Sequence, residues 1–267
     1  MSTHAAGLRR FVDLTVVLAI TEFKLRYFGN VLGYFWTLGK PLVLFGVLYV
    51  AFTEFVKFGN GIPHYAAYLI TAIVLYTYFA DATTKAVTSL LENQSLIRKL
   101  PMPLIVIPLS VSLDAAFTLC LNLVAVLIFV AASGVQFGPS WLVLPALVAV
   151  LLVFSTAIGA LLANLFVVFR DMRPIWEVVA QLAFWATPIV YTITFVPESL
   201  RKLMMANPLA VVMVQMRHSL IDHSAPSASA AAGGVVWLLI PAAIVVGTLV
   251  LSVVLHRRIA PIIAERL

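Results

Sequence analysis

Long apolar runs separated by short polar stretches dominate the 267-residue chain. A hydrocarbon core about 30 Å thick requires about 20 apolar residues in a helix. By that length, the pattern predicts six membrane-spanning helices, at residues 31–56, 62–80, 103–132, 141–169, 175–195 and 235–255. Hydrocarbon cannot hydrogen-bond backbone groups, and the unbroken apolar runs exclude the alternation of a barrel. We therefore expect an all-α polytopic membrane protein.

Residues 115–169 carry no charge and are too numerous for a single crossing. The stretch from Ser133 to Ser140 is rich in Gly, Pro and Ser, which predicts a turn between the third and fourth helices. The helix at 62–80 is expected to continue to about Leu91 and to protrude into water.

Three further segments fall outside the predicted spans. Residues 8–28 predict an amphipathic helix lying at the membrane interface, because their apolar and charged side chains separate onto two faces. Residues 203–216 are too short to cross and contain Asn207 and Pro208, which favours a re-entrant or interfacial helix before the last span. Residues 224–234, rich in Ala, Ser and Gly, predict a flexible connector.

The composition supports this pattern, with 63% hydrophobic residues, 10% charged residues and a mean hydropathy of +1.07. The net charge of +6 comes from basic residues clustered beside apolar spans, which indicates membrane topology rather than a nucleic-acid partner. Cys120 is the single cysteine, so one chain cannot build a disulfide framework or a cysteine metal cluster. The five histidines lack metal-ligand spacing except His218 and His223 in a loop; we expect all five to be solvated and expect no metal site.

The basic residues also predict orientation. With six crossings both termini share one side, and that side holds the larger set: Arg9, Arg10, Lys24, Arg26, Arg98, Lys99, Arg170, Arg173, Arg257, Arg258 and Arg266. The opposite side holds Lys57, Arg201, Lys202 and Arg217. Both termini are therefore expected to be cytoplasmic.

Several sequence blocks carry a family resemblance. They are KLRYFGNVLGYFWTL at 24–38 with Pro41 following, NQSLIRKLP at 93–101, FRDMR at 169–173, FWATPIVY at 184–191 and NPL at 207–209. In this order they resemble the permease subunits of polysaccharide ABC exporters, which move O-antigen, capsule, teichoic acid or galactan chains. The resemblance covers nearly the whole chain but does not identify the cargo.

The resemblance implies a homodimer in the bacterial cytoplasmic (inner) membrane, joined to two copies of a separate ATP-binding subunit. ATP and Mg would be bound by that partner, and no cofactor by this chain. The chain indeed lacks a G-x-x-x-x-G-K-[ST] phosphate loop. In the family, residues 91–101 would form the intracellular coupling loop, here with Glu92, Asn93, Leu96, Ile97, Arg98 and Lys99.

The residues of this loop allow two interpretations. Leu96 and Ile97 are apolar residues on a polar loop with nothing in this chain to cover them, which suggests a partner subunit. Alternatively, the loop is a connector whose basic residues only fix topology.

Aromatic residues are candidates for lining a substrate path, because sugars stack their flat C–H faces on aromatic rings. The candidates are Tyr34, Phe35, Trp36, Trp185 and Tyr191. The alternative is that they anchor the protein at the membrane interfaces or pack between helices. Pro188 would kink the helix that carries Trp185, which suits a gate but also simple packing.

Charged residues near or within the membrane complete the candidates. Asp114 is predicted near mid-membrane, as a polar lining of the path, as an interhelical contact with a partner such as Asn122 or Asn164, or as a protonated and satisfied residue of the bundle. Lys24, Arg26 and Arg98 lie at the predicted cytoplasmic surface, where they could bind the pyrophosphate or headgroup of a lipid-linked substrate. Topology and attraction to anionic lipids explain them equally simply.

Two other functions compete with polysaccharide export. A permease for a small drug or a lipid would share the architecture. A membrane enzyme, such as a polyprenyl-phosphate glycosyltransferase, requires paired carboxylates or an acidic metal motif at one membrane face. The nearest acidic pair, Asp171 and Glu177, flanks Arg173 instead. We therefore expect a transport subunit rather than an enzyme.

Overall fold

The computed structural model describes residues 2–27, 31–99, 102–136 and 138–266, and every regular element in these ranges is helical. Five helices there are long and apolar enough to cross a membrane: α2 (Val31–Val50) with η1 (Ala51–Phe55), α3 (Tyr65–Glu92), α5 (Val106–Ala132), η3 (Pro139–Val143) with α6 (Leu144–Val168), and η6 (Val235–Leu238) with α11 (Leu239–Arg266). The all-α polytopic fold is thus confirmed. The predicted turn between the third and fourth spans falls between α5 and η3, where Gly134 adopts a φ of 77°.

The segment predicted as the fifth span, 175–195, is helical only in its first part. Helix α7 (Met172–Ala186) has 15 residues, which is short for a crossing. The chain nevertheless follows α3 in the opposite direction. Trp176 Nε1 donates to Thr83 Oγ1 at 3.0 Å, and the Tyr65 hydroxyl donates to the Val190 carbonyl at 2.9 Å. Thr83 and Tyr65 lie about 27 Å apart along α3. The segment therefore traverses a membrane-sized depth, and a sixth spanning helix stays a prediction.

A proline ends α7. The residue before a proline is disfavoured in helical conformation, and Thr187 is extended with a ψ of 140°. The Tyr68 hydroxyl on α3 faces the carbonyls of both Pro188 and Tyr191, the latter at 3.0 Å. Irregular backbone at membrane depth is stable only where protein satisfies its polar groups. Helix α3 supplies that protection here.

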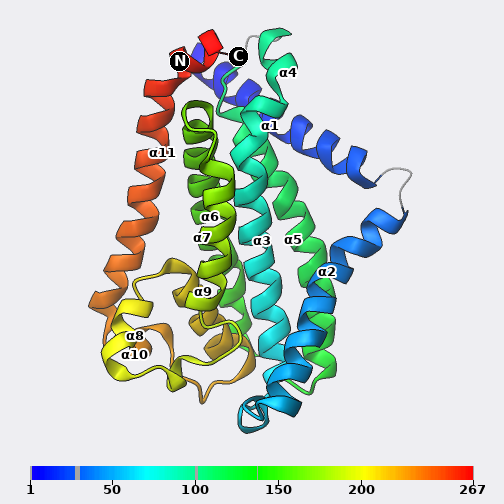
Figure 1. Cartoon of the computed structure of the whole chain (residues 1–267), viewed down its shortest axis with the longest axis vertical. Helices are drawn as coiled ribbons and strands as arrows, with labels where there is room; N and C mark the ends of the chain where they lie inside the picture. The colour runs from blue at the N-terminus through cyan, green and yellow to red at the C-terminus, as the bar shows by residue number, and fades with distance from the viewer. Residues whose placement is uncertain (1, 28–30, 100–101, 137, 267) are drawn as a thin grey trace.

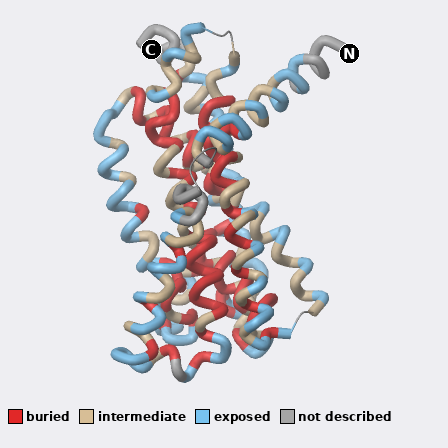
Figure 2. Tube along the Cα trace, turned by 90° about the vertical axis from the view of Figure 1, so that its right-hand side faces the viewer, coloured by how far each residue is buried: buried red, intermediate tan, exposed pale blue. Residues whose placement is uncertain are grey.

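Helix α3 forms the centre of the bundle, and Figure 2 shows buried residues concentrated along the middle of the molecule. It contacts α5 and α6 most extensively, and α2 and α7 less. Gly159 permits the close approach of α6, because a Cβ atom there would lie 2.8 Å from the Cβ of Ala86. The core is therefore built around one helix with small residues at its closest contact.

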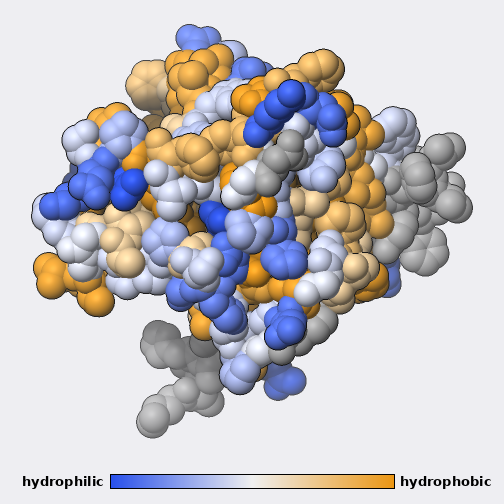
Figure 3. Space-filling view, turned by 90° about the horizontal axis from the view of Figure 1, so that it is seen from below, coloured by the Kyte–Doolittle hydropathy of each residue, from blue (hydrophilic) through white to orange (hydrophobic). Residues whose placement is uncertain are grey.

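Helices α1 (Ser2–Tyr27) and α4 (Gln94–Lys99) and the last turns of α11 lie at one end of the bundle (Figure 1). Helices α8 (Glu198–Met204) and α10 (Ala228–Ala232) lie at the other end. We call these the α4 end and the α8 end. Viewed from the α8 end, hydrophilic residues gather toward the middle of the face and hydrophobic surface borders them (Figure 3). The shared position of both terminal helices and α4 fits the predicted topology.

The segment predicted as an interfacial helix, 8–28, is helical as far as Tyr27 and forms α1, which starts earlier, at Ser2. It slants across the α4 end and packs on α5 (Figure 1). Phe11, Leu14 and Leu18 are half-buried, whereas Leu25 is exposed. The helix is therefore only partly covered by the rest of the chain.

The segment before the last span contains buried helices. Helix α9 (Pro208–Met216) begins at the cap residue Asn207, whose Oδ1 accepts the backbone N–H of Leu209 at 3.0 Å. Its side chains join the main core, so this short helix enters the bundle. The prediction of a flexible connector at 224–234 is wrong. Ser227 caps α10, whose alanines favour a helix and are small enough to pack closely.

Candidate functional site

Helix α1 is joined to the bundle by an ion pair. Arg26 Nη2 on α1 lies 2.5 Å from Asp114 Oδ2 on α5. The Asp114 side chain is fully buried, and that of Arg26 is 34% exposed. Beside the pair, the rings of Phe23 and Phe117 meet edge to face with centroids 5.8 Å apart. The interhelical partner suggested from the sequence was Asn122 or Asn164; the structure instead gives Asp114 a charged partner, because α1 lies against α5.

A second acid lies near this pair. Burial, followed by the charge of Asp114, raises the pKa of Glu22 above its usual 4.5, while Arg26 opposes the rise. One guanidinium thus faces two carboxyl groups. The residues predicted separately as a phosphate ligand, Arg26, and as a channel residue, Asp114, are one electrostatic unit.

Asn164 has a different partner. Its Oδ1 faces the Nδ1 of His256 on α11 at 2.9 Å, and its Nδ2 donates to the Ala160 carbonyl at 2.7 Å. This contact ties α11 to α6. Sequence reasoning assigned no contact to His256, although a histidine beside a span is a signal that could have been followed.

A polar cleft lies between α2, α3 and α5. Its lining residues are Trp36, Thr37, Lys40, Pro41, Thr77, Tyr78, Asp81, Lys85, Ala115, Thr118, Leu119 and Asn122, and its volume is about 50 Å³. We call it the α2 cleft. Lys40 Nζ and Asp81 Oδ1 lie 3.3 Å apart within it, and Trp36 is 62% exposed. The side chains of Tyr34 and Phe35, predicted beside Trp36, lie outside the described residues.

The predicted coupling loop is a compact helical turn. Asn93 ends α3, and its carbonyl accepts the backbone N–H groups of Leu96 and Ile97, each at 3.0 Å. Ile97 packs against an apolar cluster that includes Leu90 and Ile107. The expectation that nothing in this chain covers Leu96 and Ile97 is therefore wrong, since both are half-buried. The remaining candidates with charged side chains are exposed: Glu92, Arg98 and Lys99. Lys24, on α1, is exposed as well.

At the α8 end, Trp185 and Tyr191 lie together where α7 stops. The Tyr191 hydroxyl donates to the Trp185 carbonyl at 2.9 Å, and the Trp185 side chain is 51% exposed. The structure thus joins these two predicted residues. Trp36 lies on α2 in the α2 cleft, away from them.

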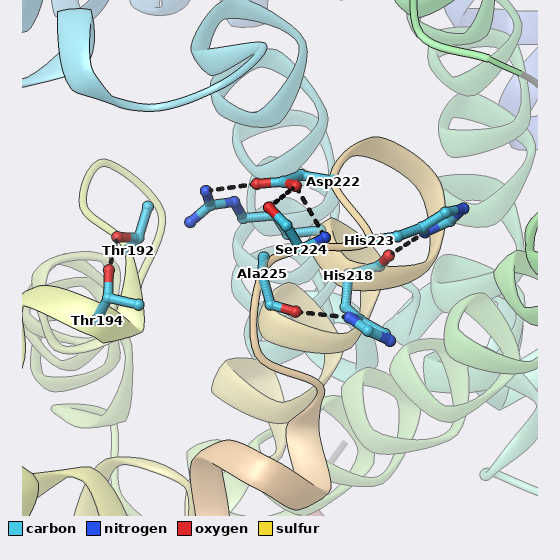
Figure 4. A network of polar contacts seen from close by, with 8 residues as sticks. Thr192, Thr194, His218, Asp222, His223, Ser224 and Ala225 are labelled. Atoms are coloured by element: carbon cyan, nitrogen blue, oxygen red, sulfur yellow. Dashed lines mark hydrogen bonds and ion pairs between the residues drawn. The ribbon is translucent and has the colours of Figure 1, made fainter.

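A buried ion pair at the α8 end was missed by sequence reasoning, which treated Arg217 only as a topology signal. Arg217 Nη2 lies 3.2 Å from Asp222 Oδ2, and both side chains are 10% exposed. Figure 4 shows Ser224 on the same carboxylate, with its Oγ donating to Asp222 Oδ1 at 2.5 Å. Burial alone would raise the pKa of Asp222, but the hydrogen bonds from Ser224 and the charge of Arg217 lower it overall. The pair fixes the loop that follows η5 (Arg217–Ile221).

Two histidines flank this pair. His218 Nδ1 lies 2.6 Å from the Ala225 carbonyl, and His223 Nε2 lies 3.3 Å from Ser140 Oγ at the start of the α6 region. The His223 contact ties the loop after η5 to the connection between α5 and α6, and the His218 contact closes the loop on itself. Among the described residues, no three His, Cys, Asp or Glu side chains are arranged to hold a metal ion.

Several helices long and apolar enough to cross a membrane, with charged groups paired between helices, are features of a polytopic membrane protein. The chain belongs to the ABC-2 type transporter family, whose model matches residues 13–221.

Its curated relatives are similar over most of their length. The O-antigen export system permease protein RfbA of Klebsiella pneumoniae is 30% identical over 207 residues, which cover 77% of this chain and 79% of the relative. RfbA of Myxococcus xanthus is 29% identical over 227 residues, covering 83% and 85%. The family resemblance carried by the sequence blocks is thereby confirmed.

Proposed function

We propose that this chain is the membrane subunit of an ATP-driven exporter that moves a lipid-linked polysaccharide across the bacterial cytoplasmic membrane. Two copies would form the translocation path, and two copies of a separate ATP-binding subunit would supply the energy. The relatives named as O-antigen export permeases favour this cargo class over a small drug or a lipid.

The main support for the proposal is the exposed face of α7. Within this helix only Ala180 is fully buried. Arg173, Glu177, Gln181 and Trp185 are exposed and follow one another at four-residue spacing, with Arg173 Nε 3.2 Å from Glu177 Oε1. Residues at this spacing form a stripe along one side of a helix.

The depth of this stripe makes its polarity informative. The Tyr76 hydroxyl donates to the Ala180 carbonyl, so Gln181 lies beside the middle of α3. Tyr76 is about 16 Å from the Tyr65 end of that helix. An amide facing lipid at this depth is costly, so such groups face water or protein. The stripe therefore suits a water-filled path or a second copy of the chain.

Aromatic side chains at two depths would serve a sugar polymer. Trp185 and Tyr191 lie at the α8 end of the stripe, and exposed Trp36 lies on α2. Tyr34 and Phe35 remain candidates from the sequence. Two copies of the chain would bring more of these residues around one path than a single copy can.

The α4 end is the proposed site of energy coupling. The exposed residues Glu92, Arg98 and Lys99, together with half-buried Asn93, Leu96 and Ile97, would contact the partner that binds ATP and Mg. Lys24 and Arg98 are exposed where a substrate pyrophosphate would arrive, whereas Arg26 is engaged with Asp114. Motion of the partner would reach α5 through α1 and this ion pair.

The proposal is tested by replacing Gln181 with leucine. Export of lipid-linked polysaccharide by cells that also contain the partner ATPase is expected to fall severalfold, with the amount of membrane-inserted protein unchanged. Val253→Ala on the exposed side of α11 is the matched control. In a Cys120→Ser background, Gln181→Cys should cross-link two copies and Val253→Cys should not. Normal export and no cross-link for the Gln181 variants would refute the proposal.

A further inference from the structure

The α2 cleft continues into an apolar cavity. The cavity has a volume of about 180 Å³ and is lined by Leu38, Pro41, Leu42, Ile70, Val74, Asn122, Ala125, Val126 and Phe129. Pro41 and Asn122 line both spaces. The two spaces therefore adjoin each other along the groove between α2 and the α3–α5 pair, the first lined by polar residues and the second mainly by apolar ones. We call it the amphipathic groove.

The depth of the groove matches the layers of a membrane. The Arg26–Asp114 pair marks the level at which the interfacial helix meets α5. Measured along α5 from Asp114, Thr118 lies about 6 Å away and Phe129 about 22 Å away. The polar end therefore lies nearer the α4 end of the bundle, and the apolar end lies deeper within it.

Two basic side chains lie at the polar end. Lys40 is paired with Asp81 at 3.3 Å, and the charge of Lys85 also acts on Glu22 of α1. Basic side chains beside a membrane surface attract anionic lipid headgroups. The exposed indole of Trp36 is also typical of the headgroup level.

Asn122 marks the junction between the two ends. Its side chain is buried at 6% exposure, and its Oδ1 has no hydrogen-bond partner. A buried amide atom without a partner costs free energy unless a ligand or water satisfies it. The amide can turn, so it can offer an acceptor to a hydroxyl or a donor to an ester carbonyl.

The polar end of the groove is small. A volume of about 50 Å³ holds only a few water-sized groups. It suits a compact phosphate better than a hexose. Below the phosphate, Thr118 and Asn122 provide polar groups at the level of the glycerol esters of a phospholipid. A polyprenyl phosphate has only hydrocarbon at that level.

We propose that the amphipathic groove binds one anionic phospholipid of the leaflet on the α4 side. Its phosphate would lie near Lys40 and Lys85, its ester groups near Asn122, and an acyl chain along Val74 and Phe129. The lipid would fill the space between α2 and the bundle. This binding does not depend on the proposed export function, because it follows from the groove alone.

The test uses the full-length chain purified in detergent and measures bound lipid by native mass spectrometry. The probes are dioleoylphosphatidylglycerol and dioleoylphosphatidylcholine. We expect the anionic lipid to bind more tightly, and each of Lys40→Gln and Lys85→Gln to weaken it by about fivefold. Lys99→Gln on α4 is the matched control and should change nothing. Equal binding of both lipids, or equal loss in the control, would overturn the proposal.

A second pair of variants keeps the test independent of charge. Ala125→Phe fills the apolar end of the groove, whereas Val124→Phe places the same ring on the exposed side of α5. Lipid binding should be lost only in the Ala125 variant, with thermal stability showing that both proteins are folded. Displacement of the phospholipid by an equal concentration of undecaprenyl phosphate would instead assign the groove to a lipid carrier and would also overturn the proposal.

Discussion

Helices α3 and α7 run side by side in opposite directions but differ in how much of their surface the rest of the chain covers. Helix α3 buries 20 of its 28 residues, and hydroxyl groups such as those of Tyr76 and Thr83 find partners within the protein. Helix α7 is shorter, ends at a proline-containing turn and buries only Ala180 completely. Both carry polar residues at membrane depth.

The comparison distinguishes polar groups that find partners within one copy of the chain from polar groups that do not. Polar groups on α3 stabilise the fold. Thr83 Oγ1, for example, donates to the Phe79 carbonyl at 2.7 Å and accepts a hydrogen bond from Trp176 Nε1. Polar groups on α7, such as Gln181, face outward. In a membrane, an outward polar face requires water or another protein surface. Helix α3 should therefore respond to substitution through stability, and α7 through function.

The largest expected effect concerns the buried helix α3 and its contact with α6. Gly159→Leu would force α6 away from α3, because even a Cβ atom lies 2.8 Å from the Cβ of Ala86. We expect a loss of about 1–3 kcal/mol or more, seen as a lower melting temperature in detergent. Gly247→Leu on α11, where a Cβ meets nothing within 4 Å, is the control. Similar melting of the two variants would mean that the α3–α6 contact is not the tight centre of the bundle.

An intermediate effect tests the junction between the two helices. Tyr68→Phe removes the hydroxyl that faces the carbonyls of Pro188 and Tyr191. Buried carbonyls without partners cost about 1–3 kcal/mol, so thermal unfolding should occur at a lower temperature. Tyr191→Phe removes an exposed hydroxyl and should change the stability by less than about 0.5 kcal/mol. If the Tyr68 variant is as stable as the wild type, α3 does not support the irregular end of α7.

The smallest effect concerns α1, which is only partly covered. Burial and the charge of Asp114 raise the pKa of Glu22 above 4.5, so ionisation opposes the folded state. The stabilisation from protonated Glu22 is complete below pH 4.5 and is lost as pH rises through the folded pKa. Glu22→Gln should therefore raise the melting temperature near neutral pH, and the gain should disappear below about pH 4.5. A gain that does not depend on pH would argue against this electrostatic cause.

The spans illustrate what the sequence could predict. The long apolar runs that became α3, α5 and α6 were recognisable because length and hydropathy are local properties. The end of α7 was not, since it depends on Pro188 and on hydroxyl groups more than a hundred residues away. The connector at 224–234 was misjudged because small residues indicate flexibility in water but permit close packing in a protein.

The residues of the candidate site also differ in how far the sequence could predict them. Asp114 was recognisable as a costly charge, yet its partner Arg26 lies 88 positions away and was expected to face the membrane surface. The Arg217–Asp222 pair left no signal beyond two ordinary charged residues in a loop. The exposure of Ile97 was misjudged because the cluster that covers it comes from α3, α5, α6 and α11.

The sequence by itself determined that this is a membrane protein, that it is helical and to which family it belongs. The reason is that apolar length, charge distribution and motif order are properties of the sequence alone. The tertiary structure alone decided which polar groups are paired and which face outward, since these depend on residues distant in sequence meeting at one depth. Gln181 and Thr83 are both polar residues in apolar helices. Only the packing of α7 against α3 shows that Thr83 supports the fold and that Gln181 faces outward.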